Sequence, residues 1–392
     1  MQLGRSLRVG ENAFENVANL TFLDLGGNRN LSLHPAALAG LAKLEVLLLD
    51  ANGLGEEVLE GGYFRDLVSL RRLDLTGNRI TRLRHDPTFQ GLAMLSSLQL
   101  KLNRLETLCG DDLQHLAGRR LELLDLASNR LSYRAACPGP FRNLSLGTLD
   151  VSSNPWDVAG AERFFAGLDG APIRHLRMQH SGAVGRGFGF HNLRGILAST
   201  FMGLFHSDVR SFDMSHGFLA ELGPSSFAGL PGLHALILTS NQISQIDGDA
   251  FAGLQALQTL DLSHNLLGAL YGEAFQPLRG CPLQHLSLRS NHLGIIQHNA
   301  LAGLGFLRRL DLRDNALPRV PSGHLPTLQH LLLAQNRIDS AWGLGQLCRN
   351  LTHLDFSANR LRDLGQLWAQ LGHLPNLRFL NASGNQLAVC SG

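Results

Sequence analysis

The chain has 392 residues and is nearly neutral, with 34 lysines and arginines, 32 aspartates and glutamates, and a formal net charge of +2. Because its basic residues are scattered rather than clustered, we expect no nucleic acid among its partners. No apolar run reaches the roughly 18 residues of a membrane-spanning helix, and the opening MQLGRSLRVG lacks the apolar core of a signal peptide.

The N-terminal third of the chain repeats one pattern, LxxLxLxxNxL. Its good copies are LEVLLLDANGL (44–54), LRRLDLTGNRI (70–80), LSSLQLKLNRL (95–105) and LELLDLASNRL (121–131), and a weaker copy starts at Leu20. Each LxL segment predicts a short strand with its leucines pointing inward, because side chains alternate along a strand. A single repeat cannot bury its own apolar face, so the copies must stack into one continuous core.

The pattern weakens in the middle of the chain. Weak copies start at Leu146, Ile173 and Val209, and the last interval is about a dozen residues longer than its neighbours. The surplus contains GRGFGFHN (185–192), whose glycines permit tight reversals, so we expect a protruding loop. The aromatic residues of this loop either pack back against the repeats or contact a partner. Its G-x-G-x-G spacing, outside a βαβ unit, argues against a nucleotide site.

Strong copies of the pattern return after the break. They cover 233–243, 257–267, 283–293, 307–317, 328–338, 351–361 and 377–387. Phenylalanine and glycine mark the other half of many repeats, as in GDAFAGLQAL (248–257), and predict an irregular outer side. Fifteen copies identify the leucine-rich repeat. We therefore predict an α/β leucine-rich-repeat solenoid, a horseshoe with a concave parallel β-sheet, an irregular convex side and about 15 repeats.

The residues at fixed positions of the repeat suggest further chemistry. The frame asparagine should turn inward and hydrogen-bond buried backbone groups, so that stacked copies form an asparagine ladder. The residue between the two leucines of LxL is aspartate in eight copies, which either bind a basic ligand or calcium or stay solvated. His330 and His353 share one strand position in adjacent repeats, so their side chains should approach each other. We expect no metal site, cofactor or catalytic centre.

The cysteines and sequons bear on the compartment. Five cysteines are too few for a disulfide scaffold, but Cys109 and Cys137 follow the asparagines of adjacent repeats. They form either a bridge between neighbouring turns or two buried thiols. Five N-x-[ST] sequons favour a secreted or cell-surface chain, and the candidate glycosylation sites are Asn19, Asn30, Asn143, Asn350 and Asn381.

Several longer segments resemble the flagellin-receptor branch of the Toll-like receptor family. They are GFGFHN (187–192), FDMSHGFL (212–219), LDLSHNLLGALYGEAF (260–275), NHLGIIQ (291–297) and LDLRDNAL (310–317). The resemblance implies a single-pass cell-surface receptor that binds bacterial flagellin monomers and then forms a homodimer. It also implies signalling through an intracellular adaptor and inflammatory transcription. We read residues 1–392 as one ectodomain fragment without N- and C-terminal caps, membrane helix or signalling domain.

The same resemblance assigns a flagellin-binding edge. A loop that grips flagellin in this family matches NLLGALYGEAF (265–275), and the frame adds residues from the next two repeats. The implied ligand-binding residues are Asn265, Leu267, Gly268, Ala269, Tyr271, Glu273, His292, Gln297 and Asp314. Glu273 and Asp314 would pair with a flagellin arginine, and Tyr271 would be a buried anchor. The alternative is structural, with Leu267 in the core and Tyr271 packed against the convex turn.

Two other functions fit the sequence less well. A matrix or growth-factor-binding protein of the small leucine-rich proteoglycan kind normally shows cysteine clusters around a shorter array, which this sequence lacks. An enzyme such as a ubiquitin ligase with a repeat arm would need a catalytic domain in addition to the repeats. We therefore expect a binding protein rather than an enzyme.

Overall fold

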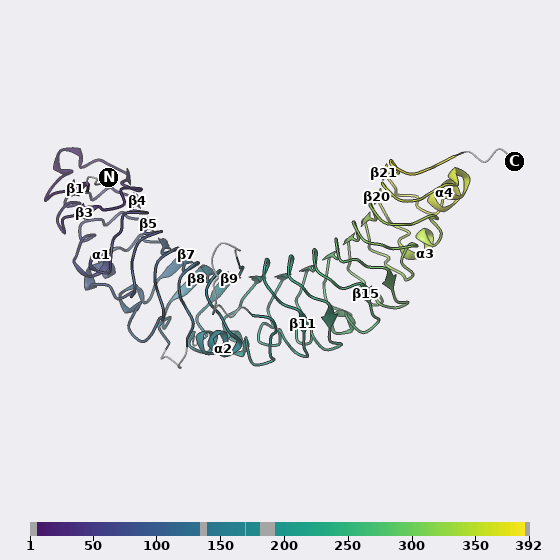
Figure 1. Ribbon diagram of the computed structural model, residues 1–392, viewed down its shortest axis with the longest axis horizontal. Helices are drawn as coiled ribbons and strands as arrows, with labels where there is room; N and C mark the ends of the chain where they lie inside the picture. The colour runs from purple at the N-terminus through teal and green to yellow at the C-terminus, as the bar shows by residue number, and fades with distance from the viewer. Residues whose placement is uncertain (1–5, 134–138, 169, 181–192, 389–392) are drawn as a thin grey trace, which may run out of the picture. The chain divides into compact units, whose positions relative to one another are not determined.

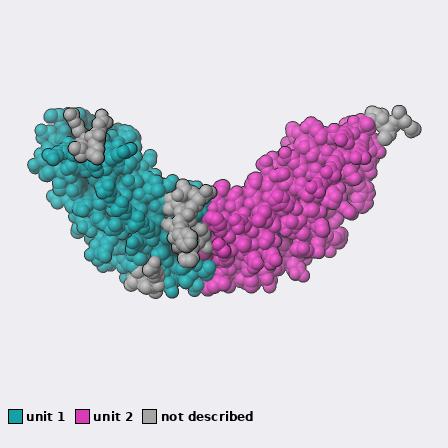
Figure 2. All heavy atoms as spheres, in the orientation of Figure 1, with its two compact units in different colours: residues 1–192, 203–209 teal, residues 193–202, 210–392 magenta. Residues whose placement is uncertain are grey.

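The chain forms two compact units in a computed structural model that describes residues 6–133, 139–168, 170–180 and 193–388. The first unit comprises residues 1–192 and 203–209, and the second comprises residues 193–202 and 210–392 (Figure 2). Each unit is a stack of coils in which strands of the main sheet lie on one side and short helices on the other (Figure 1).

The described residues of the first unit contribute seven strands to the main parallel sheet. They are β2 (Phe22–Asp24), β4 (Val46–Leu48), β5 (Arg72–Asp74), β6 (Ser97–Gln99), β7 (Arg120–Asp125), β8 (Ser145–Asp150) and β9 (Ile173–Arg177). The outer coils hold β1 (Arg8–Val9), β3 (Ser32–Leu33), α1 (Glu57–Glu60), α2 (Val158–Ala166), η1 (Glu15–Val17), η2 (Pro87–Gly91) and η3 (Gln114–Leu116).

In the second unit, the part of the chain that the structure describes contributes eight strands. They are β10 (Ser211–Asp213), β12 (Ala235–Ile237), β14 (Thr259–Asp261), β16 (His285–Ser287), β18 (Arg309–Asp311), β19 (His330–Leu332), β20 (His353–Asp355) and β21 (Phe379–Asn381). Its other elements are β11 (Glu221–Leu222), β13 (Gln245–Ile246), β15 (Ala269–Leu270), η5 (Gln276–Leu278), β17 (Ile295–Ile296), α3 (Leu344–Leu347) and α4 (Leu364–Leu371). The short helix η4 (Met202–Leu204) contains residues of both units.

The strands pair in parallel at the register that the repeat predicts. Leu236, Leu260 and Leu286 are aligned across β12, β14 and β16, and each is at most 1% exposed. On the outer side, Phe227 and Phe251 stack with ring centroids 6.1 Å apart and form part of a buried row of phenylalanines. The predicted parallel sheet and leucine-rich-repeat solenoid are therefore confirmed.

The predicted asparagine ladder is also present. Asn241 Nδ2 donates to the carbonyls of Met214 and Leu238, each at 3.0 Å, so one side chain joins two successive coils. Its Oδ1 accepts from the N–H of Leu219, and the residue is only 6% exposed. Buried backbone groups at the turn are thus satisfied by a side chain.

Two sequence predictions fall on parts of the chain that the structure does not describe. Phe188, Phe190 and His191 of the expected loop lie outside the described residues. Cys109 carries a disulfide bond, while Cys137, its proposed partner, lies outside the described residues as well. The loop and the pairing therefore remain predictions.

Candidate functional site

The aspartates of the sheet have a structural role that neither reading of the sequence anticipated. Each of the eight accepts a hydrogen bond from the backbone N–H two residues further on, as Asp261 does from Ser263 at 2.9 Å. Their carboxylates cap the turns that follow the strands. Within the described residues, no group of three or more acidic, histidine or cysteine side chains is placed to hold a metal ion.

The lateral side of the second unit carries the segment assigned to ligand binding. There β15 and β17 pair in parallel, with Ala269 opposite Ile295 and Leu270 opposite Ile296. Because side chains alternate along a strand, Ala269 and Ile295 share a face with Tyr271 and Gln297, which directly follow the two strands. We call these four residues, Ala269, Tyr271, Ile295 and Gln297, the lateral patch.

The lateral patch is exposed and partly apolar. The side chains of Tyr271 and Ile295 are 62% and 61% exposed, unlike the leucines of the frame. Gln297 Oε1 accepts a 2.9 Å hydrogen bond from the backbone N–H of Gly272, which joins the two coils just beyond the strand pair. Two aligned backbones therefore present an aromatic ring and an aliphatic side chain to solvent.

Two of the assigned residues lie in the interior instead. Asn265 is 2% exposed, and its Nδ2 donates to the carbonyls of Leu238 and Leu262 at 3.0 and 2.9 Å. Its Oδ1 accepts from Ile243 N–H, so its amide is fully used within the ladder. Leu267 is 8% exposed and belongs to the core, as the structural alternative proposed. Neither side chain is accessible to a ligand.

The turn around Gly268 departs from the regular repeat. In many repeats the residue two beyond an asparagine donates to the next ladder side chain, as Leu293 N–H does to Asn315 Oδ1 at 3.0 Å. Here Gly268, three beyond Asn265, donates its N–H to the backbone carbonyl of Asn291, and among the described residues Asn291 Oδ1 has no hydrogen-bond partner. Gly268 adopts φ +69°, which favours glycine, and it is exposed.

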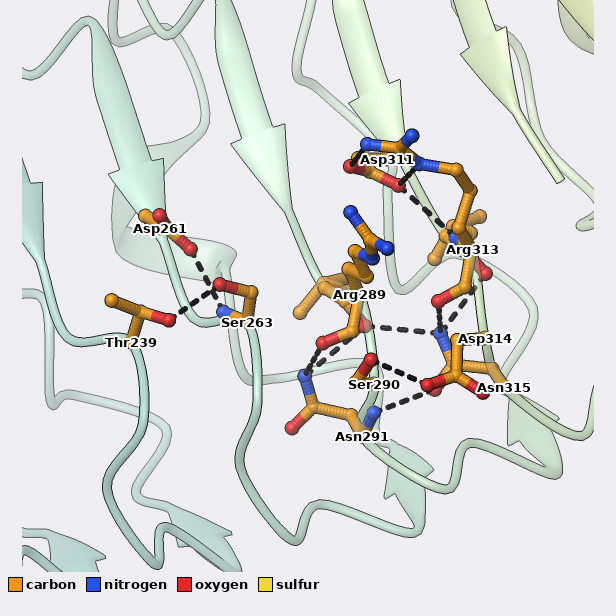
Figure 3. Close-up of polar contacts among 12 residues, drawn as sticks. Thr239, Asp261, Ser263, Arg289, Ser290, Asn291, Asp311, Arg313, Asp314 and Asn315 are labelled. Carbon is orange, nitrogen blue, oxygen red and sulfur yellow. Dashed lines mark hydrogen bonds and ion pairs between the residues drawn. The ribbon is translucent and has the colours of Figure 1, made fainter. Parts of the chain in front are cut away.

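The remaining polar residues lie on the neighbouring turns. Asp314 Oδ2 accepts a 2.7 Å hydrogen bond from the Ser290 hydroxyl, which links two successive turns (Figure 3). Asp311 is the last residue of β18, and its Oδ2 accepts a 2.8 Å hydrogen bond from the Arg313 guanidinium. This hydrogen bond raises the pKa of Arg313. Asp314 and His292 are both exposed.

Glu273 completes the set of assigned residues. It is exposed and lies against the preceding coil, where a Cβ on Gly248 would be 3.6 Å from its Oε2. The structure thus brings Ala269, Tyr271 and Gln297 together on one face, with Glu273 on the same coil as Tyr271. The sequence analysis missed Ile295, although the paired isoleucines at 295–296 were a usable signal, since alternation exposes one of them.

The sequons are mostly accessible. Asn19, Asn30, Asn143 and Asn350 are exposed, whereas Asn381 is half-buried on β21. The Oδ1 of Asn381 accepts from the N–H and hydroxyl of Ser383, so this residue caps its turn as the aspartates do elsewhere. No helix in the described part of the chain is long and apolar enough to span a bilayer.

Comparison with known proteins places these features in a family. The leucine-rich-repeat family models match residues 4–54, 57–105, 68–131, 207–267 and 347–365. Toll-like receptor 5 of Homo sapiens is 39% identical over 244 residues, covering 61% of this chain and 28% of the relative. Toll-like receptor 5 of Mus musculus is 40% identical over 246 residues, with 62% and 28% covered. The chain therefore spans about a quarter of the length of these relatives.

A solved structure supports the fold. The Toll–Spatzle complex of Drosophila matches with a TM-score of 0.62 and 17% identity, covering 97% of this chain and 53% of that one. The fifteen parallel strands of the described residues, the asparagine ladder, the family-model matches and these relatives lead to one assignment. The chain belongs to the leucine-rich-repeat family, and the relatives that it resembles at about 40% identity are Toll-like receptors.

Proposed function

We propose that this chain is the ligand-binding part of an innate immune receptor at the cell surface and that it binds bacterial flagellin monomers. The proposal rests on the likeness to Toll-like receptor 5, together with the lateral patch in the segment that carries the resemblance. On this proposal, two receptor chains pair once flagellin is bound, and signalling passes to an adaptor through an intracellular domain outside these repeats.

The single observation that carries the assigned site is the exposure of Tyr271 and Ile295 on one face of the β15–β17 pair, diagonally across it. Large side chains on a rigid strand pair lose little conformational entropy on binding and are typical anchors of protein interfaces. Glu273 and Asp314 supply carboxylates on the same and a neighbouring coil, suited to an arginine on the partner. Asn265 and Leu267 act from the interior by holding the turn, while Gly268 and His292 are exposed at its rim.

Titration of the purified chain with flagellin monomer tests the proposal. Binding should weaken at least about tenfold in the double variant Tyr271→Ala, Asp314→Ala, because an anchor and a charge contact are both lost. The matched control is Trp368→Ala with Asp339→Ala, which removes an equally exposed aromatic ring and an exposed carboxylate elsewhere in the unit. Unchanged affinity in the first variant would remove the site assignment.

Sedimentation with and without flagellin tests the pairing. A shift from one chain to two on addition of monomeric flagellin supports ligand-induced dimerisation. Absence of any binding to flagellin, with retention of fibrillar collagen or a growth factor instead, would favour the matrix-protein alternative.

A further inference from the structure

One coil of the second unit is shorter than its neighbours. From the start of β18 to the start of β19 the interval is 21 residues, whereas it is 24 from β16 to β18 and 23 from β19 to β20. A shorter coil covers less of the outer side. A cavity of about 560 Å³ lies over it, lined by Ile295 and Ile296 of the preceding coil, by residues 317–323 of the short coil, and by Trp342 of the next.

The strand β17 borders this cavity with an unpaired edge. Its hydrogen-bonded partner is β15, and Gln297 N–H donates to the Leu270 carbonyl at 2.9 Å. Since alternate residues of a parallel strand bond to opposite neighbours, the N–H and C=O of Ile296 face the short coil. Within the described chain no backbone hydrogen bond joins Ile296 to that coil, in which Pro318 and Pro321 have no N–H.

The ionisable residues that line the cavity are all basic. Its ionisable lining residues are Arg319 and His298, and a second cavity of about 700 Å³ that shares Trp342 adds Arg349 and His373. Among the described residues that line the two cavities there is no aspartate or glutamate. Trp342 stands between them with 66% of its side chain exposed. We call the two cavities together the outer groove.

We propose that the outer groove binds an acidic protein segment in extended conformation, which adds as a strand to the open edge of β17. The main chain of the segment would bond to Ile296, and its carboxylates would pair with Arg319 and Arg349. An apolar side chain of the segment would cover Trp342. The outer groove borders the lateral patch and shares Ile295 with it, but Arg319, Trp342 and Arg349 lie outside the residues assigned to flagellin, so the proposal does not depend on that function.

The alternatives fit the groove less well. A single-stranded nucleic acid needs a row of aromatic side chains on which bases stack, and the groove lining contains one aromatic ring besides its histidines. An apolar helix would leave the edge of β17 unpaired and the arginines without counter-charges. An extended acidic chain supplies both hydrogen-bond partners for the open edge of β17 and counter-charges for the arginines.

Selection from a display library of random nine-residue peptides tests the proposal on the purified chain. Acidic residues alternating with β-branched ones should be enriched. The enriched peptide, labelled with a dye, should bind on the order of tenfold more weakly to Arg319→Glu and to Trp342→Ala. Arg337→Glu and Trp368→Ala, matched exposed changes outside the groove, should bind it as the wild type does.

Three results would overturn the inference: no enrichment, enrichment of sequences without acidic residues, or equal binding by Arg319→Glu and the wild type. Thermal unfolding of each variant reports whether it is folded. If Arg319→Glu is unfolded, the same charge contact is tested on the wild-type chain with lysine in place of the peptide's acidic residues. Undiminished binding of that peptide would equally overturn the proposal.

Discussion

His330 and His353 stack on adjacent strands of the sheet, with ring centroids 4.3 Å apart and an interplanar angle of 23°. Phe379 continues the stack at 5.8 Å from His353, and the Thr352 hydroxyl lies 2.9 Å from His353 Nδ1. Arg309 precedes His330 in the same column of the sheet. The predicted approach of the two histidines is therefore confirmed, and it places a titratable ring among cationic and aromatic neighbours.

This arrangement predicts a pH-dependent stability. Burial, and then the charges of His353 and Arg309, lower the pKa of His330 from 6.5, so the unfolded chain takes up this proton at a higher pH than the folded one. The stability that neutral His330 contributes is complete above the pKa of this group in the unfolded chain. It is lost as the pH falls through that value toward the pKa in the folded chain. In denaturant titrations between about pH 7.5 and 5.5, the free energy of unfolding should therefore fall less in His330→Gln than in the wild type. Identical pH slopes would contradict this.

Replacement of a ladder asparagine should destabilise the stack. In Asn265→Ala the buried N–H of Ile243 loses its acceptor. The carbonyls of Leu238 and Leu262 each lose one donor but keep the Nδ2 of Asn241 and of Asn291. We therefore expect the free energy of unfolding to fall by about 1–3 kcal/mol. Asn385, which is only partly buried, provides the comparison, and Asn385→Ala should cost less. Urea unfolding measures both values. A loss below about 1 kcal/mol for Asn265→Ala would argue against the structural role.

The aspartates should act through hydrogen bonding rather than through charge. Asp261→Asn keeps an oxygen that can accept from Ser263 N–H, as Asn381 does from Ser383 at 3.0 Å, whereas Asp261→Ala loses it. Asp261→Ala should therefore lower stability by about 1 kcal/mol and Asp261→Asn by much less. Thermal unfolding with and without calcium completes the test. A calcium-dependent rise in the wild type that is absent from Asp261→Asn would restore the ion-binding reading.

The turn before each ladder asparagine offers a stabilising change. Leu102 adopts φ +56° with 47% of its side chain exposed, while the same slot holds Gly27, Gly77 and Gly384 in other repeats. A left-handed conformation costs an L-residue about 1–2 kcal/mol, and glycine's extra entropy offsets part of the gain. Leu102→Gly should therefore raise the free energy of unfolding by up to about 1 kcal/mol. Leu102→Ala keeps its Cβ and serves as the control, for which we expect no gain.

The sequence was sufficient for features that recur in every repeat. Strand positions, inward leucines and ladder asparagines follow from alternation and from the need to satisfy buried backbone groups. Asn265 shows the limit of residue-by-residue transfer, because the resemblance placed it in a binding edge while the frame already required it in the interior. At this position the repeat frame, rather than the resemblance, determines where the side chain lies.

Features that depend on differences between neighbouring coils could not be predicted. Which of Ile295 and Ile296 is exposed depends on the register of β17 against β15, which no single repeat specifies. The open edge of β17 follows from the short coil beside it, so it is a property of two repeats together. The departure at Gly268 also involves two coils, and it leaves Asn291 Oδ1 without a hydrogen-bond partner among the residues that the structure describes.

The capped turns also bear on how such a surface can evolve. The polar residues that recur, aspartate and asparagine, are committed to holding the coils, as Asp261 and Asn265 are. One column of the sheet consists of positions that do not cap turns and that differ from strand to strand, such as Thr259, His285 and Arg309. Substitutions at these positions can therefore change the binding surface one side chain at a time while the fold is retained.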